Sequence, residues 1–174
     1  MYSIPRYYQR ISRDFFQRHT YDVARDMLGI YIARYYRGTW LIGRIVETEC
    51  YTSDDPACHA YRGKTYRNAS LFGPVGHAYV YIIYGIHACL NVVAYDKKTH
   101  VAGGVLVRAI EPVSGVDIMC NNRNIISDAS HHMPCNLANG PGKLTQALSI
   151  DRSYDGEDVC TPGNIMVMYN PDAY

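Results

Sequence analysis

Runs of apolar residues, alternating or continuous, predict six strands along the chain. They cover residues 30–36, 40–51, 77–84, 88–95, 104–110 and 164–169. Arg37 and Gly38 supply a tight turn between the first two strands, and residues 85–87 separate the third from the fourth. Because most of the strands are joined by hairpin connections, we expect an antiparallel sheet.

Helical spacing of apolar residues predicts the remaining elements. A helix over residues 21–28 has Thr20 as its expected N-cap, an apolar stripe that includes Met27 and Leu28, and Gly29 at its end. Further helices are predicted over residues 12–16, 113–122 and 141–148, and a loop over residues 127–139. We therefore predict an α+β fold: a single domain over residues 1–174 with a curved antiparallel sheet, flanking helices and a protruding β-hairpin.

The balance of charge limits how the chain can bind a partner. The 174 residues carry a formal net charge of +1, with 17 Lys and Arg against 16 Asp and Glu. Proteins that bind nucleic acid through bulk charge are far more basic, so any DNA contacts must come from basic residues gathered on one face. The chain also has 17 Tyr but 3 Phe and 1 Trp. Tyrosine suits stacking on a flat ligand, although it can also replace Phe in a core.

The sequence indicates neither a membrane-bound nor an exported protein. No apolar run approaches the ~20 residues that span a bilayer, and residues 1–9 lack the apolar centre of a signal peptide. The six cysteines contain no Cys-x-x-Cys pair, and we expect reduced thiols. We expect an intracellular monomer, in the cytoplasm of a prokaryote or the nucleus of a eukaryote.

Acidic residues in the second predicted strand are the first candidate for catalysis. Glu47, Glu49 and Tyr51 occupy alternate positions, so their side chains should share one face. Two carboxylates so close together suit acid–base chemistry. The same pattern is typical of the exposed polar face of an edge strand, and these residues alone do not separate the two interpretations.

The polar connection between residues 52 and 74 is long for a small domain, and such loops are usually functional or mobile. His59 lies in it and could donate a hydrogen bond, act as a base or bind a metal. The spacing of Cys50, Cys58 and His59 fits no standard zinc site, so we expect no metal.

Two basic segments suit contacts with phosphate groups. Arg62, Lys64 and Arg67 lie in the long loop. Lys143 follows a Gly-Pro-Gly run at the start of the last predicted helix, where backbone N–H groups are free to bind an anion. Either segment alone could also be ordinary solvated surface.

Tyrosines cluster in the third predicted strand. Tyr81 could stack on a base that has left the duplex, whereas for Tyr79 we expect a core position. Tyr84 lies at the strand end beside Gly85, and an exposed aromatic residue at a hairpin tip suits a wedge between base pairs.

In order and spacing, these segments resemble the alkyladenine (3-methyladenine) DNA glycosylase family of the mammalian type. The similar blocks are residues 44–51 (RIVETECY, against RIVETEAY in the family), the Ala-x-His of residues 57–59, the Thr-x-Arg-Asn of residues 65–68, the tyrosine hairpin and returning Asn of residues 79–91, and residues 105–112 and 140–148. The resemblance extends from residue 14 to residue 158.

The resemblance implies a monofunctional glycosylase of base excision repair that needs no cofactor. Its partner would be double-stranded DNA containing damaged purines such as 3-methyladenine or hypoxanthine. Glu49 would be the general base for the attacking water, and Arg108 would position that water.

The resemblance also implies the residues that handle the base. Tyr51 and Tyr81 would stack on the flipped base, and His59 would supply a hydrogen bond. Tyr84 would enter the minor groove and fill the gap. Asn91 would crowd the pocket floor and disfavour the exocyclic amine of guanine.

Three departures from the family pattern bear on these expectations. Cys50 stands where Ala is usual, and His87 where Tyr is common, so packing behind the hairpin should differ. The family also continues past the position of Tyr174 through a segment that supplies a backbone contact to the water. We therefore expect either a truncated chain or a site without that contact.

Two other functions remain open from the sequence. A catalytically silent nucleic-acid-binding module would keep the tyrosine hairpin and the basic loop without turnover. A hydrolase of nucleosides or other small glycosides could use Glu47 and Glu49, although paired glycosidase carboxylates usually come from different elements.

Overall fold

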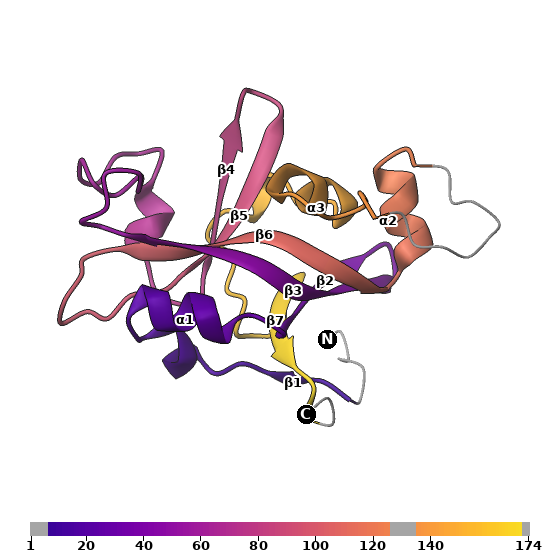
Figure 1. The fold of residues 1–174 in the computed structure, drawn as a ribbon, viewed down its shortest axis with the longest axis horizontal. Helices are drawn as coiled ribbons and strands as arrows, with labels where there is room; N and C mark the ends of the chain where they lie inside the picture. The colour runs from indigo at the N-terminus through magenta and orange to yellow at the C-terminus, as the bar shows by residue number, and fades with distance from the viewer. Residues whose placement is uncertain (1–6, 126–134, 172–174) are drawn as a thin grey trace.

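The computed structural model describes residues 7–125 and 135–171, which form one open sheet of seven antiparallel strands with helices around it (Figure 1). The strands lie in the order β1-β7-β2-β3-β6-β5-β4. They are β1 (Gln9–Arg10), β2 (Tyr31–Tyr36), β3 (Thr39–Thr52), β4 (Ala78–Ile83), β5 (His87–Val93), β6 (Gly103–Ser114) and β7 (Ile165–Tyr169). The helices are α1 (Thr20–Asp26), α2 (Val116–Asn122) and α3 (Pro141–Ala147), with short 3-10 turns η1 (Arg13–Phe16), η2 (Ala69–Phe72) and η3 (Arg152–Tyr154). The α+β prediction is confirmed.

The long strands β3 and β6 form the centre of the sheet, and α1 covers one of their faces. The hydroxyl of Thr48 donates a hydrogen bond to the backbone oxygen of Ala24 in α1, at 2.8 Å. Neighbouring side chains on a strand point to opposite faces. Glu49 therefore points to the face that α1 leaves open.

The start of α1 differs from the prediction. The N-cap is His19, whose Nδ1 accepts from the backbone nitrogen of Tyr21 at 3.3 Å. Thr20 is fully buried, and its hydroxyl donates instead to the backbone oxygen of Ala94 at 2.8 Å. The prediction of Thr20 as the N-cap is thus wrong, because the Thr20 hydroxyl is bonded to a residue distant in the sequence. Leu28, placed in the apolar stripe, is 44% exposed because the helix ends before it.

The prediction for residues 113–122 was partly wrong. Strand β6 continues to Ser114, which pairs with Ile42 of the long strand β3. Gly115 then adopts a left-handed conformation, with φ at 74°, and α2 begins only at Val116. Cross-strand pairing therefore claims residues whose local pattern is also compatible with a helix. The predicted loop at residues 127–139 lies mostly outside the described residues.

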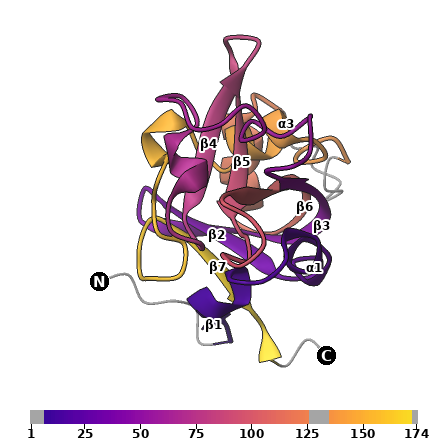
Figure 2. The ribbon, with the colours of Figure 1, turned by 90° about the vertical axis from the view of Figure 1, so that its left-hand side faces the viewer.

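Strands β4 and β5 form a hairpin that projects from the sheet (Figures 1 and 2), as predicted. Its last pair is Ile83 with His87. Tyr84 and Gly85 at the tip have φ values of 50° and 74°. A positive φ is uncommon for a residue with a side chain, so the surrounding turn must hold Tyr84 in this conformation.

The segment that includes η3 covers the inner half of the β4 edge. The backbone nitrogen of Ala78 donates to the oxygen of Glu157 at 2.7 Å. The side chain of Asp155 accepts from the nitrogen of Val80 at 2.9 Å and from the Ser70 hydroxyl at 2.8 Å. These bonds fix β4 before it leaves the sheet as part of the hairpin. In the described part of the chain, no helix combines the length and the apolar character that crossing a bilayer requires.

Candidate active site

Glu49 lies on the open face of the sheet, between two residues that hold its carboxylate. The hydroxyl of Tyr51 donates to Oε2 of Glu49 at 2.6 Å, and Nη1 of Arg108 lies 3.3 Å from Oε1. Nε of Arg108 also lies 3.6 Å from a carboxylate oxygen of Glu47. The Glu49 side chain remains 37% exposed, so a water molecule can still reach it. The predicted shared face of Glu47, Glu49 and Tyr51 is confirmed.

A β-bulge brings Arg108 to this carboxylate pair. Glu47 pairs with Ala109 and Thr48 pairs with Val107, so Arg108 has no opposite residue on β3. A bulge of this kind changes the direction of the side chains beside it. Arg108 forms ion pairs with both glutamates. The bulge therefore places the positive charge of Arg108 beside the two carboxylates.

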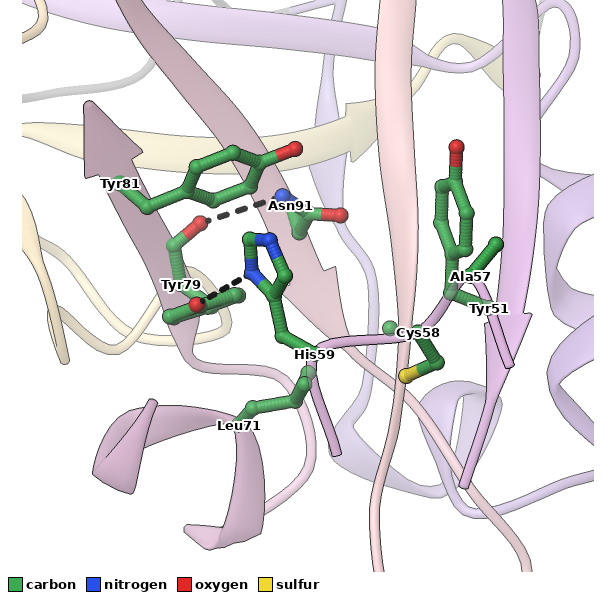
Figure 3. A pocket seen from close by; sticks show the side chains of 9 residues that line it. Tyr51, Ala57, Cys58, His59, Leu71, Tyr79, Tyr81 and Asn91 are labelled. Atoms are coloured by element: carbon green, nitrogen blue, oxygen red, sulfur yellow. Dashed lines mark hydrogen bonds between the residues drawn. The ribbon is translucent and has the colours of Figure 1, made fainter. Parts of the chain in front are cut away.

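A cavity opens beside Tyr51, between β3, β4 and the long loop (Figure 3). It encloses about 350 Å³, counting the part open to solvent. Tyr51 stands on one side, and Tyr81 and His59 stand on the other (Figure 3). The rings of His59 and Tyr81 meet edge to face, with centroids 4.5 Å apart. Three of the predicted pocket residues thus form the walls of one cavity.

Tyr79 is the hydrogen-bond partner of one ring nitrogen of His59. As expected, Tyr79 is buried, and burial raises its pKa to about 12, so it stays a phenol at neutral pH. Its hydroxyl lies 2.8 Å from Nδ1 of His59 (Figure 3). Removal from solvent, together with the charge of Arg67, lowers the pKa of His59, so its ring is neutral at pH 7. We expect the buried phenol to donate to Nδ1, and this assignment places the proton of His59 on Nε2.

The floor of the cavity combines an amide with a glycine. Asn91 is 4% exposed and donates from Nδ2 to the backbone oxygen of Tyr79, at 3.5 Å. Gly104 lies opposite Tyr51 in the sheet. A Cβ atom on Gly104 would lie 2.9 Å from a methyl carbon of Leu71, another lining residue. The absence of a side chain at Gly104 therefore preserves the depth of the cavity.

Asn68 holds the loop that carries His59. Its Nδ2 donates to the backbone oxygens of His59, at 2.8 Å, and Gly63, at 3.0 Å. Its Oδ1 accepts from the nitrogen of Thr65 at 2.6 Å. Asn68 is 4% exposed, so it shapes the loop from within and is not itself available for phosphate contacts.

The predicted phosphate contacts lie outside the cavity. Arg62 and Lys64 are exposed, and Arg67 reaches the backbone oxygen of Ile82 in β4 at 3.3 Å. On the other side of the hairpin, Lys143 donates to the side chain of Asn139 at 2.8 Å. Lys143 also lines an open hollow of about 600 Å³, counting the part open to solvent, together with Ile83, His87, Arg123, Gly140, Pro141 and Gly142. Positive side chains therefore flank the hairpin on both sides.

Tyr84 is 90% exposed at the tip of the hairpin, as its position beside Gly85 predicts.

A further feature is the arrangement of the possible metal ligands. Within residues 7–125 and 135–171, no group of three or more His, Cys, Asp or Glu side chains is arranged to hold a metal ion.

Comparison with known proteins identifies the family. The sequence pattern of the methylpurine-DNA glycosylases matches residues 14–173. The chain belongs to the methylpurine-DNA glycosylase family. The activity of this family is hydrolysis of N-glycosyl bonds in damaged DNA, so the chain is a DNA repair enzyme with DNA as its substrate.

Relatives from bacteria and archaea agree with this family. A protein of Carboxydothermus hydrogenoformans is 49% identical over 156 residues, which are 90% of this chain and 77% of the relative. A protein of Methanocella arvoryzae is 45% identical, over 92% of this chain and 78% of the relative. A third, from Methanoculleus marisnigri, is 50% identical, over 82% of this chain and 69% of the relative. Each carries the provisional name 3-methyladenine DNA glycosylase.

Three residues that matter for this glycosylase site were missed or misjudged from the sequence. Tyr79 was expected only as a core residue, but its hydroxyl is also hydrogen-bonded to Nδ1 of His59. Its position two residues before Tyr81, on the same strand face, was the available signal. Gly104 gave no signal beyond standing at the start of a strand. Asn68 appeared as one polar residue of a basic loop, and only the fold reveals its three partners.

Proposed function

We propose that this glycosylase excises alkylated or deaminated purines, such as 3-methyladenine and hypoxanthine, after turning the nucleotide out of the duplex. The observation that carries the proposal is the double role of Tyr51. Its ring forms a wall of the cavity, and its hydroxyl is bonded to Glu49 at 2.6 Å. A purine held against Tyr51 therefore has its glycosidic bond near the carboxylate.

Glu49 is the proposed general base. The C–N bond breaks with its electron pair going to the purine, and positive charge develops on the sugar. A water oxygen then bonds to the anomeric carbon while its proton passes to Glu49. The carboxylate also stabilises the cationic sugar. Arg108, 3.3 Å from the same carboxylate, orients the water. This route requires neither a lysine nucleophile nor a cofactor.

His59 is the proposed reader of the purine edge. With its proton on Nε2, it donates a hydrogen bond into the cavity. The 6-oxo group of hypoxanthine is a matching acceptor. Tyr51 and Tyr81 stack on the two ring faces, and such stacking tolerates several purines. Asn91 on the floor disfavours the 2-amino group of guanine by crowding it.

Tyr84 is the proposed wedge. Its ring is almost fully exposed at a hairpin tip, and replacing an everted nucleotide by an aromatic side chain offsets part of the lost stacking. Arg62, Lys64, Arg67 and Lys143 are the proposed backbone contacts, because they flank this hairpin and DNA binding needs local positive charge on a nearly neutral chain. We also predict that the enzyme is a monomer. We predict that it acts in the cytoplasm of a prokaryote or in the nucleus of a eukaryote, where the genome lies.

A duplex oligonucleotide with one hypoxanthine tests the proposal. We expect the wild-type protein to release free hypoxanthine, and Glu49→Gln to lower the single-turnover rate by about 100-fold or more. Glu111→Gln is the matched control, since Glu111 is an exposed glutamate of β6 paired with Arg44. Tight binding to the damaged duplex without base release would instead support the silent binding module. Cleavage of free inosine as fast as DNA would support a nucleoside hydrolase.

A further inference from the structure

Tyr66 is the most exposed large apolar side chain among the described residues. It is 97% exposed, compared with 90% for Tyr84 at the hairpin tip. In the described part of the chain, its ring stacks on no other ring. Single exposed tyrosines are common on protein surfaces, so exposure alone does not indicate a role. The loop around Tyr66 adds the evidence.

Hydrogen bonds from the buried side chain of Asn68 connect several residues of the loop that carries Tyr66. The side chain of Asn68 bonds the backbone of Thr65 on one side of Tyr66, and those of Gly63 and His59 further back. Gly63 has φ at 87°, which favours glycine there. The residues on both sides of Tyr66 are therefore held by hydrogen bonds within the loop, which favours a preformed surface for a ligand that contacts the ring.

The loop contacts both the cavity and the hairpin. Asn68 joins it to His59, a wall of the cavity, and Arg67 joins it to Ile82, two residues before Tyr84. Figure 2 shows the segment before η2 passing in front of β4. A DNA strand that delivers a nucleotide to the cavity while Tyr84 occupies the duplex would pass over this loop.

Charge and chemistry around Tyr66 match a sugar–phosphate chain. Arg62, Lys64 and Arg67 lie within four residues of it, and the first two are exposed without an acidic partner among the described ion pairs. The guanidinium and ammonium groups suit phosphates, and a flat ring suits the apolar face of a deoxyribose or a base. An acidic protein would satisfy the cations but would leave the ring without a flat partner.

We propose that Tyr66 is a second aromatic DNA contact, which packs against the damaged strand beside the nucleotide that enters the cavity. This proposal rests on the base flipping proposed above. Tyr84 would fill the gap in the duplex, and Tyr66 would hold the neighbouring part of the strand at the mouth of the cavity. Tyr66 is a binding residue in this scheme and has no part in breaking the bond.

Binding is best measured in a Glu49→Gln background, which prevents turnover. With a hypoxanthine duplex, we expect Tyr66→Ala to raise Kd at least fivefold, since aromatic stacking on nucleic acid contributes a factor of this size or more. Tyr66→Phe should stay within about twofold, because the contact needs only the ring. Tyr21→Ala is the control, since Tyr21 is 60% exposed on α1, away from the hairpin. A Kd for Tyr66→Ala equal to that of the control overturns the proposal.

Fluorescence gives a second, direct readout. Tyr66→Trp introduces a reporter at the loop, and Tyr21→Trp a matched one on α1. We expect DNA to quench the first and leave the second unchanged, and an unchanged signal from both overturns the proposal. If the wild type releases no base while Tyr66→Ala still weakens DNA binding, the proposed catalysis fails and the contact stands.

Discussion

The hydroxyl of Tyr51 donates a hydrogen bond of 2.6 Å to Oε2 of Glu49. This hydrogen bond raises the pKa of Tyr51 to about 12, and burial is the second cause of the shift. The phenol therefore remains a donor across the physiological pH range. Tyr51 also lines the aromatic cavity. One side chain thus connects the surface that stacks on a base with the carboxylate that activates water.

The bond between Tyr51 and Glu49 can be removed without removing the ring. We expect Tyr51→Phe to lower the single-turnover excision rate about tenfold, because the carboxylate loses the donor that orients it. Affinity for the hypoxanthine duplex should change little. Tyr51→Leu is the comparison, and it should also weaken binding because the flat wall is lost. An unchanged rate in Tyr51→Phe would show that the hydroxyl has no part in the reaction.

Filling the floor of the cavity should block the base without affecting the duplex contacts. A Cβ atom at Gly104 would lie 2.9 Å from Leu71, so Gly104→Ala should push that side chain into the cavity. We expect at least a tenfold loss of hypoxanthine excision, with undamaged duplex affinity unchanged. Adding Leu71→Val to Gly104→Ala should restore part of the rate by making room. No rescue, together with a lower unfolding temperature, would indicate a general packing defect instead.

Removing the aromatic side chain at the hairpin tip should affect the turning-out of the base more than initial DNA binding. We expect Tyr84→Ala to reduce excision from a duplex by about tenfold or more, since nothing then fills the gap left by the nucleotide. Rates on single-stranded DNA, where no stacking partner must be replaced, should fall much less. Equal losses in damaged and undamaged duplex affinity at an unchanged excision rate would argue against a wedge.

His59 should titrate below the ordinary range for histidine. Its pKa is lowered from 6.5, first by loss of solvent and then by Arg67, so the unfolded chain takes up this proton at a higher pH than the folded one. The stability that neutral His59 contributes is therefore complete above pH 6.5 and is lost as the pH falls through its folded pKa. NMR titration of the ring should give a value below 6.5. His59→Gln should flatten the fall in unfolding temperature from pH 7.5 to 5.5, and an unchanged pH dependence in this variant would contradict the prediction.

Salt dependence should count the phosphate contacts. We expect Lys64→Ala and Lys143→Ala each to weaken binding to damaged and undamaged duplexes alike, and to reduce the slope of log K against log salt by about 1. Lys97→Ala is the control, because this exposed lysine lies in the connection between β5 and β6, away from the hairpin. A slope that Lys143→Ala leaves unchanged would remove that lysine from the DNA contacts.

The pattern of apolar and polar residues predicted the strands well, because each strand is marked by residues close together in the sequence. Alternation identified β2, β3, β4, β5 and β7 to within a few residues, and the Arg37–Gly38 turn has the positive φ values, 49° and 89°, of a tight hairpin. Pattern failed where a distant partner decided the outcome. Ser114 belongs to β6 because Ile42 lies opposite it, and Thr20 is no cap because Ala94 takes its hydroxyl.

The same division applies to the site. Alternation correctly put Glu49 and Tyr51 on one face, and the turn beside Gly85 correctly exposed Tyr84. The position of Arg108 depends on a bulge, which arises from the register between β3 and β6 and has no mark in either strand. The hydrogen bond at Nδ1 of His59 depends on Tyr79, twenty residues away in the sequence.

The sequence by itself determined which side chains are available and which of them share a strand face, because side-chain direction along a strand follows from backbone geometry. Only the tertiary structure decided which of them meet. The distances that make a carboxylate a base, or a ring nitrogen a donor, arise between strands and loops, and they are set by register, burial and the depth left by a glycine, none of which a single segment encodes.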